Sequence, residues 1–339
     1  MKKIRMYVIS PKTKALHLGS ALLFILGFLV SPLFYSLEIT SLPAIFTADG
    51  GTGFPSHFAI ASTVLPLYDV PLPKEQKQDS LPVQPTAEPF TVTKAPANRY
   101  TPSQGIYVQN DTSYSFDIDT LLTSPVRLSK DKSVLIYHTH TSEAYTPSEK
   151  YTYTQSDPYR SENPDYNMVL VGKEIADHLR KKGINVIHDT TCHDFPSYSG
   201  SYDRSLATIE KNMAENSSIG LVLDIHRDAI AGDDGKYLKT YMPDSNPPCA
   251  QALIVIGTDE GGLNHPGWQE NLKLGLSLQQ IMKNTYPSLA RPLHLRTERF
   301  NGHASNGALL LEIGSNGNTM EEALNCARLV ADCITRLFQ

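Results

Sequence analysis

The sequence predicts an α/β fold: a single domain over residues 105–339, with a mostly parallel sheet flanked by helices. Short apolar runs that suit buried strands alternate with amphipathic stretches that suit helices, a pattern typical of such a sheet. Three of the apolar runs end close to a histidine or a carboxylate. Open α/β sheets bind ligands at the carboxyl ends of their strands, so these runs also predict where a functional site lies.

The first 37 residues predict a membrane anchor. Residues 1–14 carry five basic side chains, and residues 15–37 contain no Asp, Glu, Lys or Arg. About 20 predominantly apolar residues suffice for a spanning helix. Because a basic flank stays in the cytoplasm, we expect a cytoplasmic tail (1–14), a transmembrane signal anchor (15–37) and an extracytoplasmic remainder, as in a single-pass protein of the cell membrane. The bulky Leu33, Phe34 and Tyr35 favour a retained anchor over a cleaved signal peptide.

Residues 38–104 predict an extracytoplasmic spacer. Eight prolines between Pro66 and Pro102 stand among Thr, Ser, Lys, Gln and Asp. Such a composition does not build a core and favours extended, polyproline-like conformations. We therefore expect this segment to hold the following domain away from the membrane.

The first elements of the domain follow from periodicity and turn residues. Gly105–Val108 and Tyr114–Ile118 predict two short strands joined by a turn. Val134–Ile136 is continuously apolar and predicts a fully buried strand. Met168–Lys182 has apolar residues along one side and predicts an amphipathic helix that Gly183 caps.

The same alternation continues to the end of the chain. The predicted strands are Ile184–Ile187, Ile219–Ile225, Ala252–Ile256 and Ala308–Ile313, and the predicted helices are Tyr202–Asn216, Trp268–Tyr286 and a last helix ending at Phe338. A capping box, Thr319-Met-Glu-Glu322, marks the start of that last helix.

The first predicted buried strand runs directly into candidate metal ligands. It reads Val134-Leu-Ile-Tyr-His138-Thr-His140-Thr-Ser-Glu143. Side chains alternate along a strand, so we expect His138 and His140 to point to the same side. Two imidazoles and a carboxylate at a strand end are the ligand types that zinc prefers. A histidine at a strand end is often only a hydrogen-bonded structural residue, so the site needs further ligands from elsewhere in the chain.

Two later strands supply candidates for the same edge. One reads Leu221-Val-Leu-Asp224-Ile-His226-Arg227-Asp228, and the other reads Leu309-Leu-Leu-Glu312-Ile-Gly314. If these strands are parallel to the first, their ends meet at one rim. A catalytic zinc takes three protein ligands, and a nearby carboxylate that is not a ligand can act as general base and acid. Glu312 inside an apolar strand is costly unless it is paired or functional.

Two arginines are candidates for substrate contacts. Arg227 can bind a substrate carboxylate, and its structural alternative is an ion pair. Arg160 lies in a polar, tyrosine-rich loop that is long enough to suggest a functional role in gripping substrate. Asp224 and Asp228 can instead bind a cation or orient a histidine.

Composition excludes some classes of protein. The formal net charge is −5 and the pI is near 6.1, so nothing recommends nucleic acid as a partner. The four cysteines show no C-x-x-C spacing, which argues against a zinc ribbon or a redox dithiol.

These motifs resemble a known family. His138-Thr-His140-Thr-Ser-Glu143-Ala-Tyr145, Asp224-Ile-His226-Arg227-Asp228 and Leu310-Leu-Glu312-Ile-Gly-Ser-Asn-Gly-Asn-Thr-Met-Glu-Glu322 are similar, in order, to those of the stage II sporulation protein P family. Its members are membrane-anchored cell-wall hydrolases of spore-forming bacteria. The resemblance covers residues 105–339, and the anchor and spacer match the family's layout.

The resemblance implies a zinc-dependent N-acetylmuramoyl-L-alanine amidase, with a zinc amidase-like fold and additional endopeptidase activity on peptidoglycan. It also implies a role in forespore engulfment, with the stage II sporulation proteins D and M as partners. By the pattern of the wider zinc amidase family, His140 and His226 correspond to metal histidines and Glu312 to the catalytic glutamate. His138 remains a competitor of His140. Glu143 is the candidate for the middle ligand, with Glu162 as its alternative.

Two other functions remain open at this point. The first is a non-catalytic peptidoglycan-binding scaffold with the same fold. The second is a cation-dependent phosphoesterase that uses Asp224, Asp228 and His226. The second is less expected, because the first strand carries no cluster of aspartates.

Overall fold

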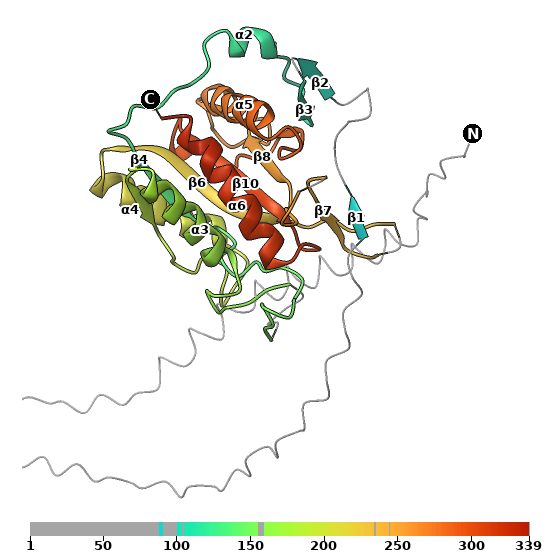
Figure 1. The fold of residues 1–339 in the computed structure, drawn as a ribbon. Helices are drawn as coiled ribbons and strands as arrows, with labels where there is room; N and C mark the ends of the chain where they lie inside the picture. Colours follow the sequence, from blue (N-terminus) through green and yellow to red (C-terminus); the bar gives the residue numbers. More distant parts are fainter. Residues whose placement is uncertain are drawn as a thin grey trace, which may run out of the picture. The chain divides into compact units, whose positions relative to one another are not determined.

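An eight-stranded sheet organises the computed structural model (Figure 1), which describes residues 88–90, 100–103, 105–154, 159–233, 235–243 and 245–338. The strand order is β2-β3-β9-β8-β10-β6-β4-β5. The strands are β2 (Tyr100–Ser103), β3 (Ile106–Asn110), β4 (Ser133–Tyr137), β5 (Val186–His188), β6 (Ile219–Asp228), β8 (Ala252–Gly257), β9 (Leu293–Arg296) and β10 (Ala308–Ser315). A separate parallel pair joins β1 (Glu88–Phe90) to β7 (Leu238–Thr240).

The sheet is mixed but mostly parallel. Strands β5, β4, β6 and β10 are parallel neighbours, and β8, β9 and β3 form a second parallel group. The two groups meet where β10 pairs antiparallel with β8, and β2 pairs antiparallel with β3. The carboxyl ends of β4, β6 and β10 therefore lie at one edge, as the sequence predicted for the three strands with polar ends.

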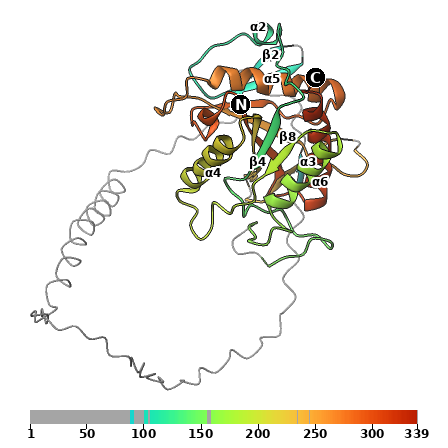
Figure 2. The same cartoon turned by 90° about the vertical axis from the view of Figure 1, so that its left-hand side faces the viewer.

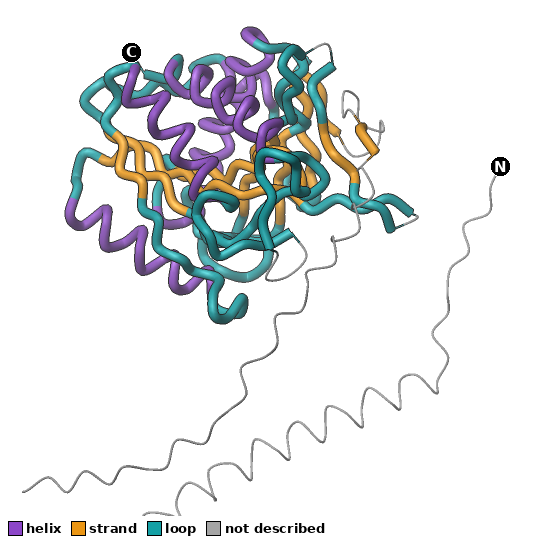
Figure 3. The backbone as a smooth tube through the Cα atoms, turned by 60° about the horizontal axis from the view of Figure 1, so that its bottom comes forward, coloured by secondary structure: helices purple, strands orange, loops and turns teal. Residues whose placement is uncertain are grey.

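Helices cover the two faces of the sheet unequally (Figures 1 and 2). The helices are α2 (Ile118–Leu122), α3 (Met168–Lys181), α4 (Ser201–Glu215), α5 (Trp268–Thr285) and α6 (Met320–Thr335). Helices α3, α5 and α6 pack in the large core on one face. On the other face Ile209 of α4 packs on residues of β4, β6 and β10. Figure 3 shows helices on both sides of the strands.

Alternation along each strand assigns side chains to the two faces. In β6, Leu221, Leu223 and Ile225 lie in the core of α3, α5 and α6. Val222 lies in the cluster below α4 instead. Asp224 and His226 share the parity of Val222, so they belong to the α4 face. Asp224 and His226 therefore project to the side that carries a single helix, whereas Arg227 has the opposite parity.

The helix ends confirm several predictions. The Thr319 hydroxyl accepts from the Glu322 backbone N–H, and the Glu322 carboxylate accepts from the Thr319 N–H, so the capping box is formed. The Asn167 side chain caps α3 by accepting from the Val169 N–H. Gly183 follows α3 with a φ of 80°, a left-handed conformation that glycine adopts without strain.

The structure corrects the predicted elements at several points. Tyr114–Ile118 is not a strand, because the Asp117 carboxylate accepts from the backbone N–H groups of Asp119 and Thr120 and starts α2. Strands β7 and β9 were missed because they have only three and four residues. Strands β1 and β2 lie inside the predicted spacer, so sheet pairing extends before Gly105.

Other sequence-based predictions fall on the part that is not described. The predicted tail and anchor, residues 1–37, lie outside the described residues. Among the residues that are described, none of the helices combines the length and hydropathy needed to cross a membrane. All four cysteines are free thiols.

His138 packs between β4, β5 and α3. Strand β4 ends at Tyr137, so alternation no longer governs the residues that follow, and the prediction that His138 and His140 share a side is wrong. The His138 Nδ1–H donates to the Ile225 carbonyl at 3.1 Å, and its Nε2 lies 2.9 Å from Nε2 of His188. Because Nδ1 carries the proton of the neutral ring, His188 must donate and His138 accept. Burial, with the nearby His188, lowers the pKa of His138 to about 3.

Gly172 lets α3 approach this histidine pair. A Cβ added at Gly172 would lie 2.6 Å from the His138 ring and 2.7 Å from His188 Nε2. Alanine usually stabilises an exposed helix interior by about 1 kcal/mol relative to glycine. Here we expect Gly172→Ala to destabilise the domain by about 1–3 kcal/mol, because the buried rings leave no room. Urea denaturation followed by circular dichroism measures this. Lys173→Ala, on the exposed side of the same turn, is the control. A stabilised Gly172→Ala variant would contradict the packing.

The histidine pair predicts a loss of stability in acid. Burial, reinforced by Arg180, lowers the pKa of His188 to about 4. The unfolded chain binds this proton near pH 6.5 and the folded chain does not, so stability present above pH 6.5 is lost as the pH falls toward 4. We expect His188→Gln to remove roughly 1–3 kcal/mol of this loss between pH 6.5 and 4. Denaturation midpoints across that range measure it, with His178→Gln on α3 as the control. Equal acid dependence in wild type and His188→Gln would refute the assignment.

Candidate active site

A cleft of about 580 Å³ lies at the edge where β4, β6 and β10 end. Four of the residues that the sequence singled out as ligands or catalytic base line it together. They are His140, Glu143, His226 and Glu312. The remaining lining residues are Gln109, Tyr202, Arg227, Asp228, Ala229, Leu253, Val255, Arg291, Pro292, His294, Arg296, Glu298, Phe300 and Leu310. The chain thus brings segments from residue 109 to residue 312 around a single cavity.

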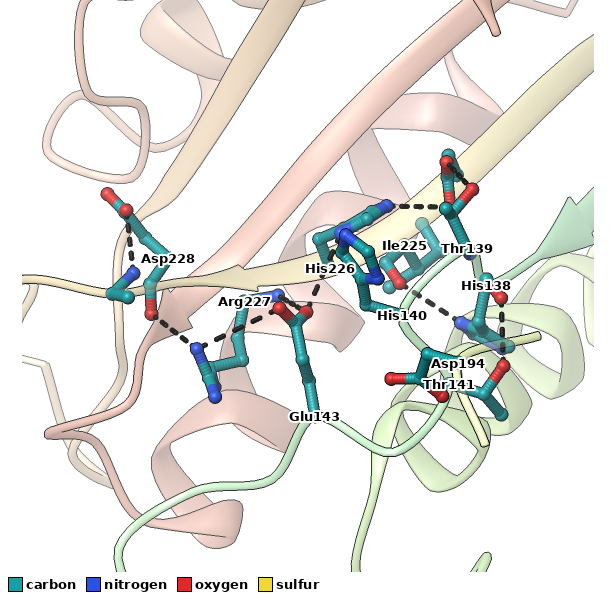
Figure 4. A network of polar contacts seen from close by, with 12 residues as sticks. His138, Thr139, His140, Thr141, Glu143, Asp194, Ile225, His226, Arg227 and Asp228 are labelled. Atoms are coloured by element: carbon teal, nitrogen blue, oxygen red, sulfur yellow. Dashed lines mark hydrogen bonds and ion pairs between the residues drawn. The ribbon is translucent and has the colours of Figure 1, made fainter. Parts of the chain in front are cut away.

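His226 lies between two carboxylates at the centre of this cleft (Figure 4). Its Nε2 is 2.9 Å from Asp224 Oδ1, and its Nδ1 is 3.5 Å from Glu143 Oε2. The residue is only 3% exposed. Burial alone would lower the pKa of His226, but Asp224 and Glu143 raise it well above its usual value. Both nitrogens of the ring are therefore oriented by negative charge.

Asp224 is itself held by the turn after β4. The Thr139 hydroxyl and backbone N–H donate to its two oxygens at 2.6 and 2.9 Å. Although burial opposes its charge, His226 and these donors hold the pKa of Asp224 below its usual value. A carboxylate on one imidazole nitrogen is the common way in which proteins orient a metal-binding histidine. Nδ1 of His226 therefore points toward Glu143 and the cleft.

Glu143 is positioned by Arg227. The Arg227 backbone N–H donates to Glu143 Oε2 at 3.2 Å, and Arg227 Nη1 lies 3.9 Å from Glu143 Oε1. Burial opposes the charge of Glu143, but Arg227 and His226 lower its pKa to about 2. The Arg227 guanidinium also donates to the carbonyls of Ala144 and Tyr159. These contacts give Arg227 a structural role in the loop; the residue also lines the cleft, so the substrate contact that the sequence suggested stays a prediction.

His140 faces His226 with its ring nitrogens in other contacts. The two ring centroids are 5.2 Å apart, and the rings are nearly perpendicular. His140 Nε2 lies 3.0 Å from the Tyr198 hydroxyl, and Nδ1 lies 3.4 Å from the Ser201 hydroxyl. The Tyr198 ring also stacks on His140. Burial, reinforced by His226, lowers the pKa of His140 to about 4. The ring is therefore neutral at pH 7, the form that binds metals.

Glu312 enters the cleft from β10, directly opposite His226 in the parallel pairing. Its side chain is half-buried, and its Oε2 has no hydrogen-bond partner among the described residues. Burial raises the pKa of Glu312 to about 8; His226 opposes this effect, and Asp228 and Glu143 add to it. A carboxyl group that exchanges its proton near neutral pH suits a general acid and base.

Three predicted site residues lie elsewhere. His138 is fully buried against β5 and α3 and does not line the cleft. Glu162 is exposed and also lies outside the cleft, so Glu143 is the glutamate that the structure places with the two histidines. Arg160 donates to Asp194 at 2.7 Å and to Ser142 at 3.0 Å. Its guanidinium lies over the Tyr198 ring at 4.9 Å, so it acts on the cleft through that tyrosine.

Sequence reasoning missed one side of the cleft. Tyr202, Arg291, His294 and Arg296 line it, yet none of them was a candidate. In β9 the apolar Leu293 and Leu295 alternate with His294 and Arg296. That alternation was a usable signal, but only four residues carry it.

The side chains around His226 fit a divalent metal ion by donor type. Two imidazoles and a carboxylate are typical zinc ligands, and they come from one buried cluster. Among the described residues, however, no group of three or more His, Cys, Asp or Glu side chains is arranged to hold a metal ion as it stands. His140 in turn contacts Tyr198 and Ser201 through its two ring nitrogens. His140 has to give up one of these contacts to become a ligand.

Two solved amidase structures are similar to this chain. CwlD amidase of Clostridioides difficile, in complex with the GerS lipoprotein, has a TM-score of 0.38 and 12% identity, over 61% of this chain and 98% of that one. The catalytic domain of CwlV, an N-acetylmuramoyl-L-alanine amidase from Bacillus (Paenibacillus) polymyxa var. colistinus, has a TM-score of 0.35 and 14% identity, over 60% of this chain and 97% of that one.

Comparison of the sequence with known proteins gives a more specific result than comparison of the structures. Stage II sporulation protein P of Bacillus subtilis (strain 168) is 28% identical over 228 residues. The match covers 63% of this chain and 53% of that protein, so the chain spans about half the length of its relative. The family model described as stage II sporulation protein P (SpoIIP) matches residues 69–335, and so includes every element of the cleft. The chain therefore belongs to the stage II sporulation protein P family.

Proposed function

We propose that this chain is a zinc-dependent peptidoglycan hydrolase of sporulation, an N-acetylmuramoyl-L-alanine amidase that also has endopeptidase activity. One observation carries the proposal. Three distant segments bring His140, Glu143, His226 and Glu312 into one cleft, and the pKa of each of these side chains is shifted from its usual value. Perturbed groups that share a cleft are typical of catalytic sites. Membership of the sporulation family supports the substrate class.

His140, Glu143 and His226 would hold the zinc ion. The Asp224 carboxylate lies at ion-pair distance from His226 Nε2, although without hydrogen-bond geometry, so Nδ1 would be the nitrogen offered to the metal and would lose its proton on binding. Arg227 keeps Glu143 ionised and close to His226. When bound, zinc supplies polarisation of the substrate carbonyl and lowers the pKa of water to about 7.

Glu312 would move the proton. Hydrolysis of an amide requires a base that removes a proton from water and an acid that delivers one to the leaving amine. The carboxyl of Glu312, with a pKa near 8 and an oxygen that has no partner among the described residues, can do both in turn at neutral pH. Its place opposite His226 on adjacent strands puts it beside the same reacting group.

The cellular setting is part of the proposal and depends on sequence. Residues 15–37 would anchor the chain in the cell membrane with the hydrolase outside. The family resemblance alone suggests the stage II sporulation proteins D and M as partners during engulfment.

Metal removal tests the proposed chemistry. We expect the 339-residue chain in detergent to release stem peptides from purified peptidoglycan, to lose this activity in excess chelator, and to regain it with added Zn²⁺. Chromatography of the released peptides measures all three. Unchanged release after complete metal removal would exclude a metal hydrolase. A pure, folded chain without metal or cleavage would favour a non-catalytic peptidoglycan-binding scaffold.

Substitution of Glu312 tests its role as the proton-transfer group. We expect Glu312→Gln to lower kcat by about 10²–10⁴-fold, because the amide keeps the shape but cannot exchange a proton. Zn²⁺ content should stay the same, since Glu312 is not a proposed ligand. Glu162→Gln, at the exposed alternative glutamate, is the matched control and should keep normal activity. Normal cleavage by a folded Glu312→Gln variant would refute the assignment.

A further inference from the structure

The β9 side of the cleft carries three basic residues and is called the basic end below, although a carboxylate pairs with each of them. Arg291 precedes β9, and His294 and Arg296 lie on it. In β9, Leu293 and Leu295 are buried in the core of α3, α5 and α6, so His294 and Arg296 point to the opposite face of the sheet. Glu312 and His226 lie on that same face. The proposed catalytic group and this basic end therefore share one surface of the sheet.

An apolar floor joins the two ends. Leu253, Val255 and Leu310 form a separate cluster on the cleft face of β8 and β10. Leu253 is paired with Glu312, and the Arg291 backbone N–H donates to the carbonyl of the neighbouring Ala252 at 2.8 Å. The backbone of Arg291 is thus two strand spacings, or about 10 Å, from that of Glu312, and its guanidinium pairs with Asp228 on β6. An extended peptide covers that distance in about three residues.

Arg291 has donor capacity left for a ligand. Its Nη1 pairs with Asp228 Oδ2 at 2.7 Å. Its Nε is shielded from solvent and has no hydrogen-bond partner among the described residues. A guanidinium can bind a carboxylate through two parallel N–H groups, so the Nε–Nη2 edge of Arg291 suits a second anion beside Asp228.

The other two basic residues already have partners. Arg296 pairs with Glu298 at 2.9 Å, but that glutamate is about half exposed and can turn away. His294 Nε2 lies 2.6 Å from Asp111 Oδ2. Burial lowers the pKa of His294, so the ring is neutral at pH 7, and Arg291 remains the principal donor.

We propose that Arg291, supported by Arg296, binds a carboxylate of the substrate peptide about three residues from the amide that is cut. This inference depends on the proposed function, because it takes Glu312 as the position of the reacting bond. The ligand class is an acidic peptide attached to a sugar lactyl group. Arg291 is then a specificity-determining residue that selects free carboxylates over amides at that position.

Binding of two matched compounds tests the subsite. One is an N-acetylmuramoyl tripeptide whose only carboxylate is at its C-terminus, and the other is its C-terminal amide. Calorimetry with the full chain carrying Glu312→Gln measures binding without turnover. We expect the acid to bind at least about tenfold more tightly than the amide, as for a charged hydrogen-bonded pair.

Substitutions at the basic end should change this preference selectively. Arg291→Gln should abolish it, Arg291→Lys should reduce it, and Arg296→Gln should weaken it less. Arg328→Gln is the matched control and should leave the preference unchanged. Arg328 lies on α6 and forms an exposed ion pair with Glu174 on α3. Arg291→Lys keeps the charge beside Asp228, so it still tests the subsite if Arg291→Gln does not fold.

Each outcome has a separate meaning. Equal binding of acid and amide, no binding of either, or a full preference in Arg291→Gln overturns the subsite. If peptidoglycan is still cleaved in that case, the proposed function stands. If the preference is found but the unsubstituted chain cleaves no peptidoglycan, the hydrolase proposal fails and Arg291 remains a site for peptide carboxylates.

Discussion

The site depends on the placement of one buried imidazole between two carboxylates. His226 has Asp224 on one nitrogen and Glu143 on the other, and all three side chains are nearly excluded from solvent. Removing one member of such a group leaves an uncompensated buried charge, which costs several kcal/mol. Thr139 and Arg227 hold the two carboxylates in turn. The geometry of the cleft is therefore maintained by charge compensation across β4 and β6.

The topology of the sheet places Glu312, the remaining group of the site. Because β10 runs parallel to β6, Glu312 lies beside His226 although 86 residues separate them in sequence. The same strand turns its leucines alternately to the two faces, so the carboxylate at position 312, which shares the parity of Leu310, lies on the cleft face. Burial there favours the protonated form of Glu312, and the protein accepts this cost at the position where a proton donor is useful.

The sequence was sufficient where long apolar runs ended in unusual residues. Strands β4, β6 and β10 and their polar ends could be predicted because burial on both faces gives a strong local signal. The direction of the His138 side chain was predicted wrongly, because strand alternation was extended to residues beyond Tyr137, where the strand ends. The contacts of Arg227 with backbone carbonyls of a loop could not be predicted, because such partners leave no trace in composition. The basic side at β9 was missed because four residues give too short a pattern.

The contact between Tyr198 and His140 has a thermodynamic consequence. If a metal ion and Tyr198 compete for the same imidazole, the two equilibria are linked, and the linkage is reciprocal. Any change that moves the segment around Tyr198 away from His140 raises the affinity for the metal. Metal binding favours release of that segment by the same factor. Arg160, which lies over the Tyr198 ring and pairs with Asp194, would then influence the metal concentration at which the site fills, without being a ligand itself.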